Sequence, residues 1–103
     1  MKPNNTLGIV VNSNRYFNHV THLADAALQD QKDVRVHLMG PGWAYIQTKD
    51  CKRLSKTVCM TLCMTSARRF AQGKLEKLDN IITLVNPDEL SKILGDCSRY
   101  VVF

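Results

Sequence analysis

Five short apolar runs recur along this chain, and segments with the apolar spacing of helices lie between them. The runs cover residues 7–11, 34–39, 57–63, 81–85 and 100–103. Strands that alternate with helices form a parallel sheet with right-handed crossovers and helices on both faces. The pattern therefore predicts an α/β fold with three layers and a five-stranded, mostly parallel sheet.

The helical segments run from 17 to 31 or 32, over 43–56, over 64–78 with an interruption at Gly73, and from Pro87 to Gly95 with Asn86 as a side-chain cap. For five strands the common arrangement is the flavodoxin-like order 2-1-3-4-5. Arg35 and His37 alternate with apolar residues in the second run, as in strands at a sheet edge. This alternation favours the same order, which places the second strand at an edge.

The length of 103 residues fits a single domain, residues 1–103, with one hydrophobic core. Hydrophobic residues make up 45% of the chain, yet no apolar run approaches the roughly 20 residues of a membrane-spanning helix. The N-terminus has no apolar stretch of signal-peptide length. We expect no membrane insertion and a cytoplasmic location.

The formal net charge is +5, from 14 basic and 9 acidic residues. Basic residues cluster at 49–56 and at Arg68 and Arg69, without interleaved aromatic residues. A modest surplus of this kind is typical of a solvated helix face. We therefore expect no nucleic-acid partner.

Cys63 ends the third predicted strand, directly before a helix that contains Arg68 and Arg69. In a 2-1-3-4-5 sheet, ligands bind beyond the carboxyl ends of the first and third strands. The candidate cleft residues there are Asn12, Ser13, Asn14, Thr65 and Ser66. A helix N-terminus and nearby arginines stabilise a thiolate, which is the nucleophilic form. A buried small hydrophobe at a strand end is an equally weighted alternative.

The other cysteines lack such a position. Cys59 lies four residues before Cys63 on the same strand face, about 13 Å away, which exceeds the roughly 7 Å limit for a disulfide. We expect Cys59 in the core, with neither a disulfide nor a shared metal. If this segment were a helix, the two cysteines would meet and a metal site would become plausible. Cys51 and Cys97 are predicted to be structural.

His19 and His22 share one face of the first helix, at the end of the sheet that carries Cys63. His19 is a further candidate for orienting or deprotonating the thiol, and both histidines with Cys63 form a less favoured metal site. His37 is expected at the surface. Glycine-rich dinucleotide and phosphate-loop motifs are absent, so no cofactor is predicted, with a flavin or nucleotide at 12–14 as a weak alternative.

Nearly the whole chain resembles the DsrE/TusD-like family of small sulfur-relay proteins. The resemblance lies in Gly-Ile-Val-Val-Asn-Ser at 8–13 before an alanine-rich helix, in the strand at 34–40, and in Cys-Met-Thr-Ser at 63–66. In active members, a cysteine at the end of the third strand accepts sulfane sulfur as a persulfide, and Cys63 matches that position. The family usually continues with an Arg-Gly pair, whereas this chain has Arg-Arg-Phe-Ala at 68–71.

The resemblance implies a sulfur carrier or sulfurtransferase-like protein that receives sulfur from one protein and passes it to another. It also implies a homo-oligomer, a trimer or hexamer, in which Trp43 and Tyr45 of the second helical segment are buried at a subunit contact. The alternative is a non-catalytic oligomeric module that keeps the fold and binds a small ligand or protein partner.

Overall fold

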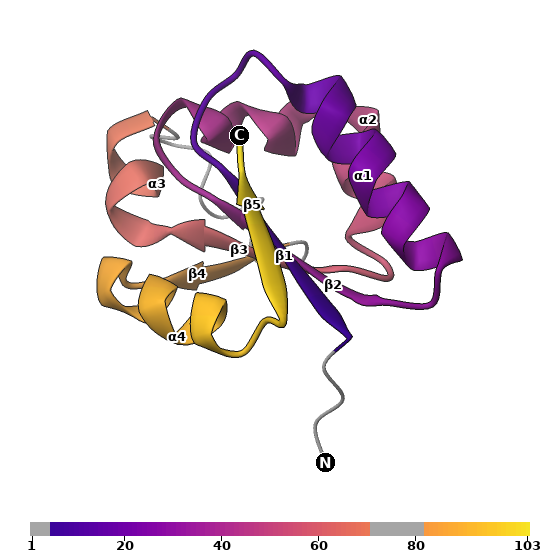
Figure 1. Ribbon diagram of the computed structural model, residues 1–103. Coiled ribbons are helices and arrows are strands. Elements are labelled where there is room, and N and C mark those ends of the chain that lie inside the picture. The colour runs from indigo at the N-terminus through magenta and orange to yellow at the C-terminus, as the bar shows by residue number, and fades with distance from the viewer. Residues whose placement is uncertain (1–4, 71–81) are drawn as a thin grey trace.

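The computed structural model describes residues 5–70 and 82–103, which form a five-stranded sheet. The strands are β1 (Thr6–Val11), β2 (Asp33–Leu38), β3 (Cys59–Cys63), β4 (Thr83–Val85) and β5 (Arg99–Val102). Every neighbouring pair is parallel, and helices cover the sheet (Figure 1). The predicted α/β class and the positions of the strands are confirmed.

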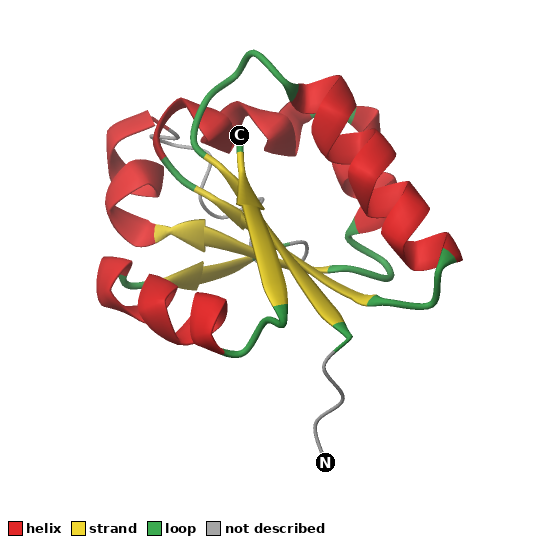
Figure 2. Ribbon diagram, viewed as in Figure 1, coloured by secondary structure: helices red, strands yellow, loops and turns green. Residues whose placement is uncertain are grey.

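Within residues 5–70 and 82–103, helical elements connect the strands (Figure 2). They are α1 (Phe17–Gln29), the 3-10 helix η1 (Gly40–Gln47), α2 (Lys49–Leu54), α3 (Met64–Phe70), the 3-10 turn η3 (Pro87–Glu89) and α4 (Leu90–Gly95). The single helix expected over 43–56 is divided, because Thr48 is extended and its side chain caps α2. Asn86 makes no side-chain cap, contrary to prediction. The predicted helix over 71–78, with its interruption at Gly73, lies outside the described residues.

The strand order is β4-β3-β2-β1-β5, so the predicted order 2-1-3-4-5 is wrong. The second strand is central, between β1 and β3, and the edges are β4 and β5. The chain steps one strand at a time from β1 to β4 and then crosses back to β5. Right-handed crossovers therefore place α1, α2 and α3 on one face and α4 on the other (Figure 1).

The two faces of the sheet differ in how well they are covered. The core lies beneath α1, η1, α2 and α3, and its buried strand residues are Ile9, Val11, Val34, Val36, Leu38, Met60 and Leu62. Among the described residues, the opposite face carries the six-residue helix α4 and the turn η3 before it. Tyr100 and Val102 on β5 consequently remain 55% and 56% exposed. Arg35 is partly exposed on this face although β2 is a central strand, whereas His37 on the same face is buried.

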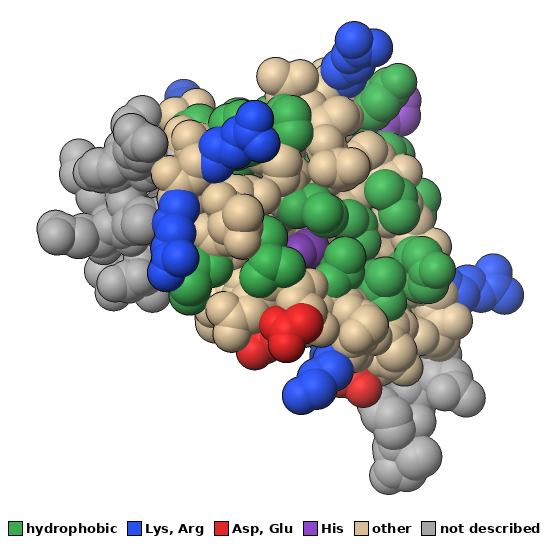
Figure 3. Space-filling model, turned by 90° about the vertical axis from the view of Figure 1, so that its left-hand side faces the viewer, with side chains coloured by type: hydrophobic (Ala, Val, Ile, Leu, Met, Phe, Trp, Pro, Cys, Tyr) green, Lys and Arg blue, Asp and Glu red, His purple; other side chains and the backbone are tan. Residues whose placement is uncertain are grey.

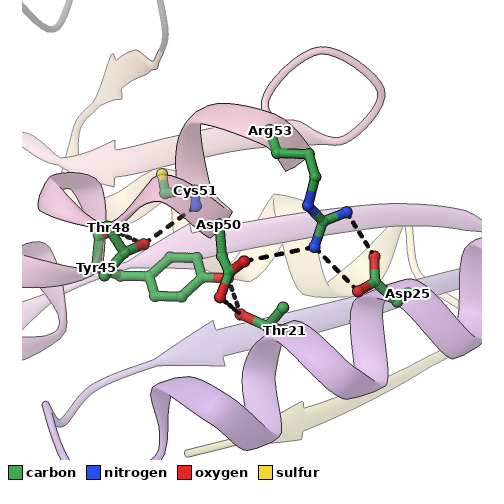
Figure 4. Close-up of polar contacts among 7 residues, drawn as sticks. All are labelled: Thr21, Asp25, Tyr45, Thr48, Asp50, Cys51 and Arg53. Carbon is green, nitrogen blue, oxygen red and sulfur yellow. Dashed lines mark hydrogen bonds and ion pairs between the residues drawn. The ribbon is translucent and has the colours of Figure 1, made fainter.

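A polar cluster joins α1 to η1 and α2 (Figure 4). The hydroxyl groups of Thr21 and Tyr45 share a 2.5 Å hydrogen bond inside the core. Arg53 binds both carboxylate oxygens of Asp25, at 2.9 and 3.0 Å, and lies 3.6 Å from Asp50. Tyr45 is fully buried by its own chain, so its burial requires no partner subunit, contrary to the expectation for this segment.

Within the described part of the chain, none of the helices combines the length and apolarity needed to cross a bilayer.

Candidate functional site

The carboxyl ends of β3 and β4 form the topological switch point of this sheet. Ligands of open α/β sheets bind where neighbouring strands send the chain to opposite faces. β3 leads into α3 on one face, and β4 leads through η3 into α4 on the other (Figure 1). Cys63, the last residue of β3, pairs with Val85, the last residue of β4. Cys63 therefore lies at the switch point, although the order that predicted this position was wrong.

The Cys63 thiol is free and largely enclosed. Its residue is 5% exposed, and no hydrogen bond to its sulfur occurs among residues 5–70 and 82–103. Helix α3 begins at the next residue, Met64, without an intervening loop. Ligands of open α/β sheets bind beyond the carboxyl ends of the strands. A nucleophile at this position therefore encounters its substrate at that end of the sheet.

The two candidate arginines lie on the exposed side of α3. The guanidinium of Arg68 turns back toward the start of the helix, where Nη2 lies 3.5 Å from Met64 Sδ. The guanidinium of Arg69 instead lies 5.4 Å from the ring centroid of Phe70. Arg68 is therefore the arginine that lies over the residue after Cys63, and neither side chain bonds the cysteine sulfur.

A turn at Gly40 brings together parts of the two loops in the predicted cleft. The Gly40 N–H donates to Ser66 Oγ at 2.8 Å, and Ser66 is buried. Gly40 has a φ of +54°, and a Cβ there would lie 2.9 Å from Asn12 Oδ1. Asn12 and Ser66 thus both approach this glycine, even though β2 separates β1 from β3.

The remaining cleft residues do not converge on Cys63. Thr65 is exposed on the first turn of α3, while Asn14 is exposed in the loop after β1. Ser13 Oγ is buried without a hydrogen-bond partner in the described residues. The predicted cleft is therefore divided, with Thr65 and Ser66 beside Cys63 and with Ser13 and Asn14 at the end of β1.

His19 is not brought to Cys63. Its ring lies 5.9 Å from that of Tyr16 and 6.4 Å from that of Phe103, which follows β5. Strands β1 and β2 lie between β5 and β3. The end of β5, where the His19 ring lies, is therefore three strand spacings from β3 and Cys63, about 14 Å in total. Among the described residues, no three His, Cys, Asp or Glu side chains are grouped to hold a metal ion. The set of His19, His22 and Cys63 is therefore not assembled.

His37 is the residue that sequence reasoning missed. It is 2% exposed rather than superficial, and its Nδ1 lies 2.8 Å from Thr61 Oγ1 on the neighbouring strand. Burial lowers the pKa of His37 below its usual 6.5, which favours the neutral ring. Cys63 follows Thr61 by two residues on the same face, so His37 is its diagonal neighbour, with about 7–8 Å between Cα atoms. Only the adjacency of β2 and β3 reveals this relationship.

The other three cysteines differ in exposure. Cys59 is exposed at the start of β3 on the thinly covered face, so the prediction that it is a core residue is wrong. Cys51 is fully buried against Met60, and burial raises the pKa of its thiol to about 12. Cys97 donates to the carbonyl of Ile93 at 3.2 Å, and burial raises its pKa as well.

Comparison with known proteins identifies the fold and no family. No protein-family model matches the sequence, and no curated protein matches it significantly. A solved structure of a conserved protein of unknown function from Bacteroides thetaiotaomicron is similar with a TM-score of 0.80. The similarity covers 100% of this chain and 98% of that protein, at 14% sequence identity. At this identity the similarity establishes a shared α/β fold alone.

Proposed function

We propose that this protein is a cytoplasmic sulfur carrier or sulfurtransferase-like protein in which Cys63 accepts sulfane sulfur from a donor protein. One observation carries the proposal: a free cysteine is the last residue of β3, at the switch point between β3 and β4. The proposal also agrees with the resemblance of this segment to sulfur-relay proteins.

The transfer needs no oxidant or metal. The Cys63 thiolate attacks the outer sulfur of a donor persulfide, so a new sulfur–sulfur bond forms at Cys63 and the donor's sulfur–sulfur bond breaks. The donor leaves as a thiolate. Neutral His37, the diagonal neighbour on β2, is the base proposed to accept the Cys63 proton before attack. Arg68, over the first turn of α3, is the cation proposed to favour the anionic sulfur.

The enclosure of Cys63 suits a carrier. A persulfide is readily attacked by other thiols, and a site closed to solvent suppresses such side reactions. Because only 5% of the residue is exposed, Cys63 reacts with donors that bind at the carboxyl ends of β3 and β4. Cys59, exposed at the other end of the same strand, lacks this protection.

We also propose that the protein is a homo-oligomer, a trimer or hexamer by resemblance, assembled through the sheet face that α4 leaves open. Tyr100 and Val102 are more than half exposed there, on the edge strand β5. Hydrophobic side chains also gather in the middle of the side that carries α3 and α4 (Figure 3). Light scattering should give a multiple of the 11.7 kDa chain mass, and Val102→Lys should lower it. A monomer at all concentrations would reject the assembly.

The sulfur-carrier proposal is tested by intact-mass measurement after incubation with a persulfide donor. The wild-type chain and Cys59→Ser should gain the mass of one sulfur atom that a reductant removes. Cys63→Ser should gain none. Equal gain by Cys63→Ser and the wild-type chain would reject Cys63 as the acceptor.

The alternative function, a non-catalytic binding module, is favoured by the lack of any described hydrogen bond to the Cys63 sulfur. Titration with a small thiol reagent distinguishes the two functions. A carrier should show a Cys63 that reacts at neutral pH, in Cys59→Ser protein, faster than the buried Cys51. Reaction of Cys63 at the same slow rate as Cys51 would support the binding module.

A further inference from the structure

A cavity of about 520 Å³ lies at the amino-terminal ends of the strands. Cys63 lies at the opposite, carboxyl-terminal ends. The lining residues of the cavity come from the starts of β1 and β5, from the middle of α1 and from the turn before β2. They are Asn5, Thr6, Leu7, Leu23, Lys32, Ser98 and Arg99. The volume falls within the range of about 300–1,000 Å³ that is common for small-molecule sites.

The turn after α1 fixes Lys32 at this cavity. Gln31 is left-handed, with a φ of 60°, and its N–H bonds the carbonyl of Leu28 at 3.0 Å. The Lys32 N–H bonds the carbonyl of Ala27 at 2.9 Å, which completes a Schellman motif. The Lys32 ammonium then donates to Asn5 Oδ1 at 3.1 Å. The position of this cation is therefore set by the backbone as well as by its side chain.

The wall formed by β1 and β5 is equally well defined. Ser98 Oγ accepts from the Thr6 N–H at 2.9 Å and donates to the Thr6 carbonyl at 3.0 Å. Arg99 is the register partner of Leu7, so the two side chains lie on the same face of the sheet. Leu23 approaches that face from α1. The cavity thus combines an apolar surface with a cationic rim.

The charge of the rim is one-sided. None of the lining residues is acidic, and Arg99 has no ion pair with any residue that the structure describes. Lys32 lies 3.4 Å from Asp30, but their side chains are 39% and 73% exposed, so this pair is weak. Two cations beside two leucines match a ligand with one anionic group and one apolar group.

We propose that this cavity binds a small organic carboxylate with a short apolar group. The planar guanidinium of Arg99 pairs with both carboxylate oxygens, Lys32 adds a second charge-assisted contact, and the apolar group lies on Leu7 and Leu23. The site is independent of sulfur transfer, because it lies at the opposite end of the strands from Cys63.

The test is a titration of the full chain with hexanoate, followed by amide chemical shifts. Saturable shifts are expected at Leu7, Leu23, Lys32 and Arg99, with none at Cys63 or Val85. Hexanamide, which lacks the charge, and inorganic phosphate, which lacks the apolar group, should each bind at least about tenfold more weakly. Equal binding of either probe, or the absence of saturation, would overturn the proposal.

Two variants localise the anion. Arg99→Ser should weaken hexanoate binding about tenfold, because a charge-assisted pair is lost while the backbone pairing of this exposed residue with Leu7 is kept. Arg15→Ser is the matched control, since Arg15 is also exposed but lies in the loop after β1, at the carboxyl ends of the strands. Equal affinities of the two variants for hexanoate would place the anion elsewhere and contradict the assignment.

Discussion

The phenol of Tyr45 and the hydroxyl of Thr21 form a buried hydrogen bond between η1 and α1. Thr21 Oγ1 also lies 3.4 Å from Asp50 Oδ2, so this bond continues into the polar cluster that includes Arg53. Tyr45 and Ile46 are buried in the same core that supports β2 and β3. The bond therefore fixes the long connection between β2 and β3, the strand that carries Cys63.

Replacing Tyr45 with phenylalanine removes this bond while keeping the ring. We expect Tyr45→Phe to lower the free energy of unfolding by about 1–2 kcal/mol, because the Thr21 hydroxyl loses its closest buried partner. Tyr16→Phe is the matched control, since Tyr16 is 45% exposed. Urea denaturation measures both variants, and an equal, negligible effect would show that the Tyr45 bond contributes nothing.

Stability should fall at alkaline pH. Burial raises the pKa of Tyr45 from 10.0 to about 12 and that of Cys51 from 9.0 to about 12. The unfolded chain releases these protons at lower pH than the folded chain, so unfolding becomes easier as pH rises from 9.0 toward 12. The double variant Tyr45→Phe, Cys51→Ala should show a flatter dependence in urea denaturation across this range. The same slope as wild type would contradict the assignment.

A second loss of stability is expected at mildly acidic pH. Burial lowers the pKa of His37 below 6.5, so the unfolded chain binds a proton more readily than the folded chain. The contribution of His37 to the free energy of unfolding is complete above pH 6.5 and decreases as the pH falls below that value. His37→Gln keeps a polar side chain that can hydrogen-bond Thr61 and removes the titration, so its unfolding free energy should depend less on pH. An unchanged acid slope would show that another group is responsible.

The end of α1 offers a stabilising substitution. Gln31 adopts the left-handed conformation that glycine accepts without strain. Gln31→Gly should therefore raise the free energy of unfolding by about 1 kcal/mol. Ala26→Gly, inside α1 at an exposed position, should lower it by about 1 kcal/mol. Thermal and urea unfolding test the pair, and two changes of the same sign would refute the explanation.

The strands could be predicted locally, but their order could not. Val34, Val36 and Leu38 indicate a strand with one buried face, and that strand is present. The alternation of Arg35 and His37 with these apolar residues can be explained in two ways, by a strand at the sheet edge or by a thinly covered face of the sheet. The sheet edge is excluded, because β2 is central: Arg35 is partly exposed on the face that carries α4, whereas His37 is buried under the cover of that face. That cover depends on distant parts of the chain.

The site shows the same division between local and distant information. Cys63 could be placed at a strand end from its own segment. The switch point includes Cys63 as expected, but it lies between β3 and β4 and not between β1 and β3. His37 could not be associated with it, because their shared face depends on the pairing of β2 with β3. The assumed order instead placed His19 near Cys63, whereas two strands separate β5 and β3. Contacts between neighbouring strands thus determine which residues surround the cysteine.

The location of transferred sulfur is the most direct test of Cys63 as the acceptor. Trypsin cleaves after Lys56 and Arg68, so a single peptide of residues 57–68 contains both Cys59 and Cys63. Tandem mass spectrometry of that peptide, after treatment of the folded protein with a persulfide donor, assigns the added sulfur to one of the two. We predict sulfur on the enclosed Cys63. Sulfur on the exposed Cys59 alone, or on neither cysteine, would contradict the proposed function.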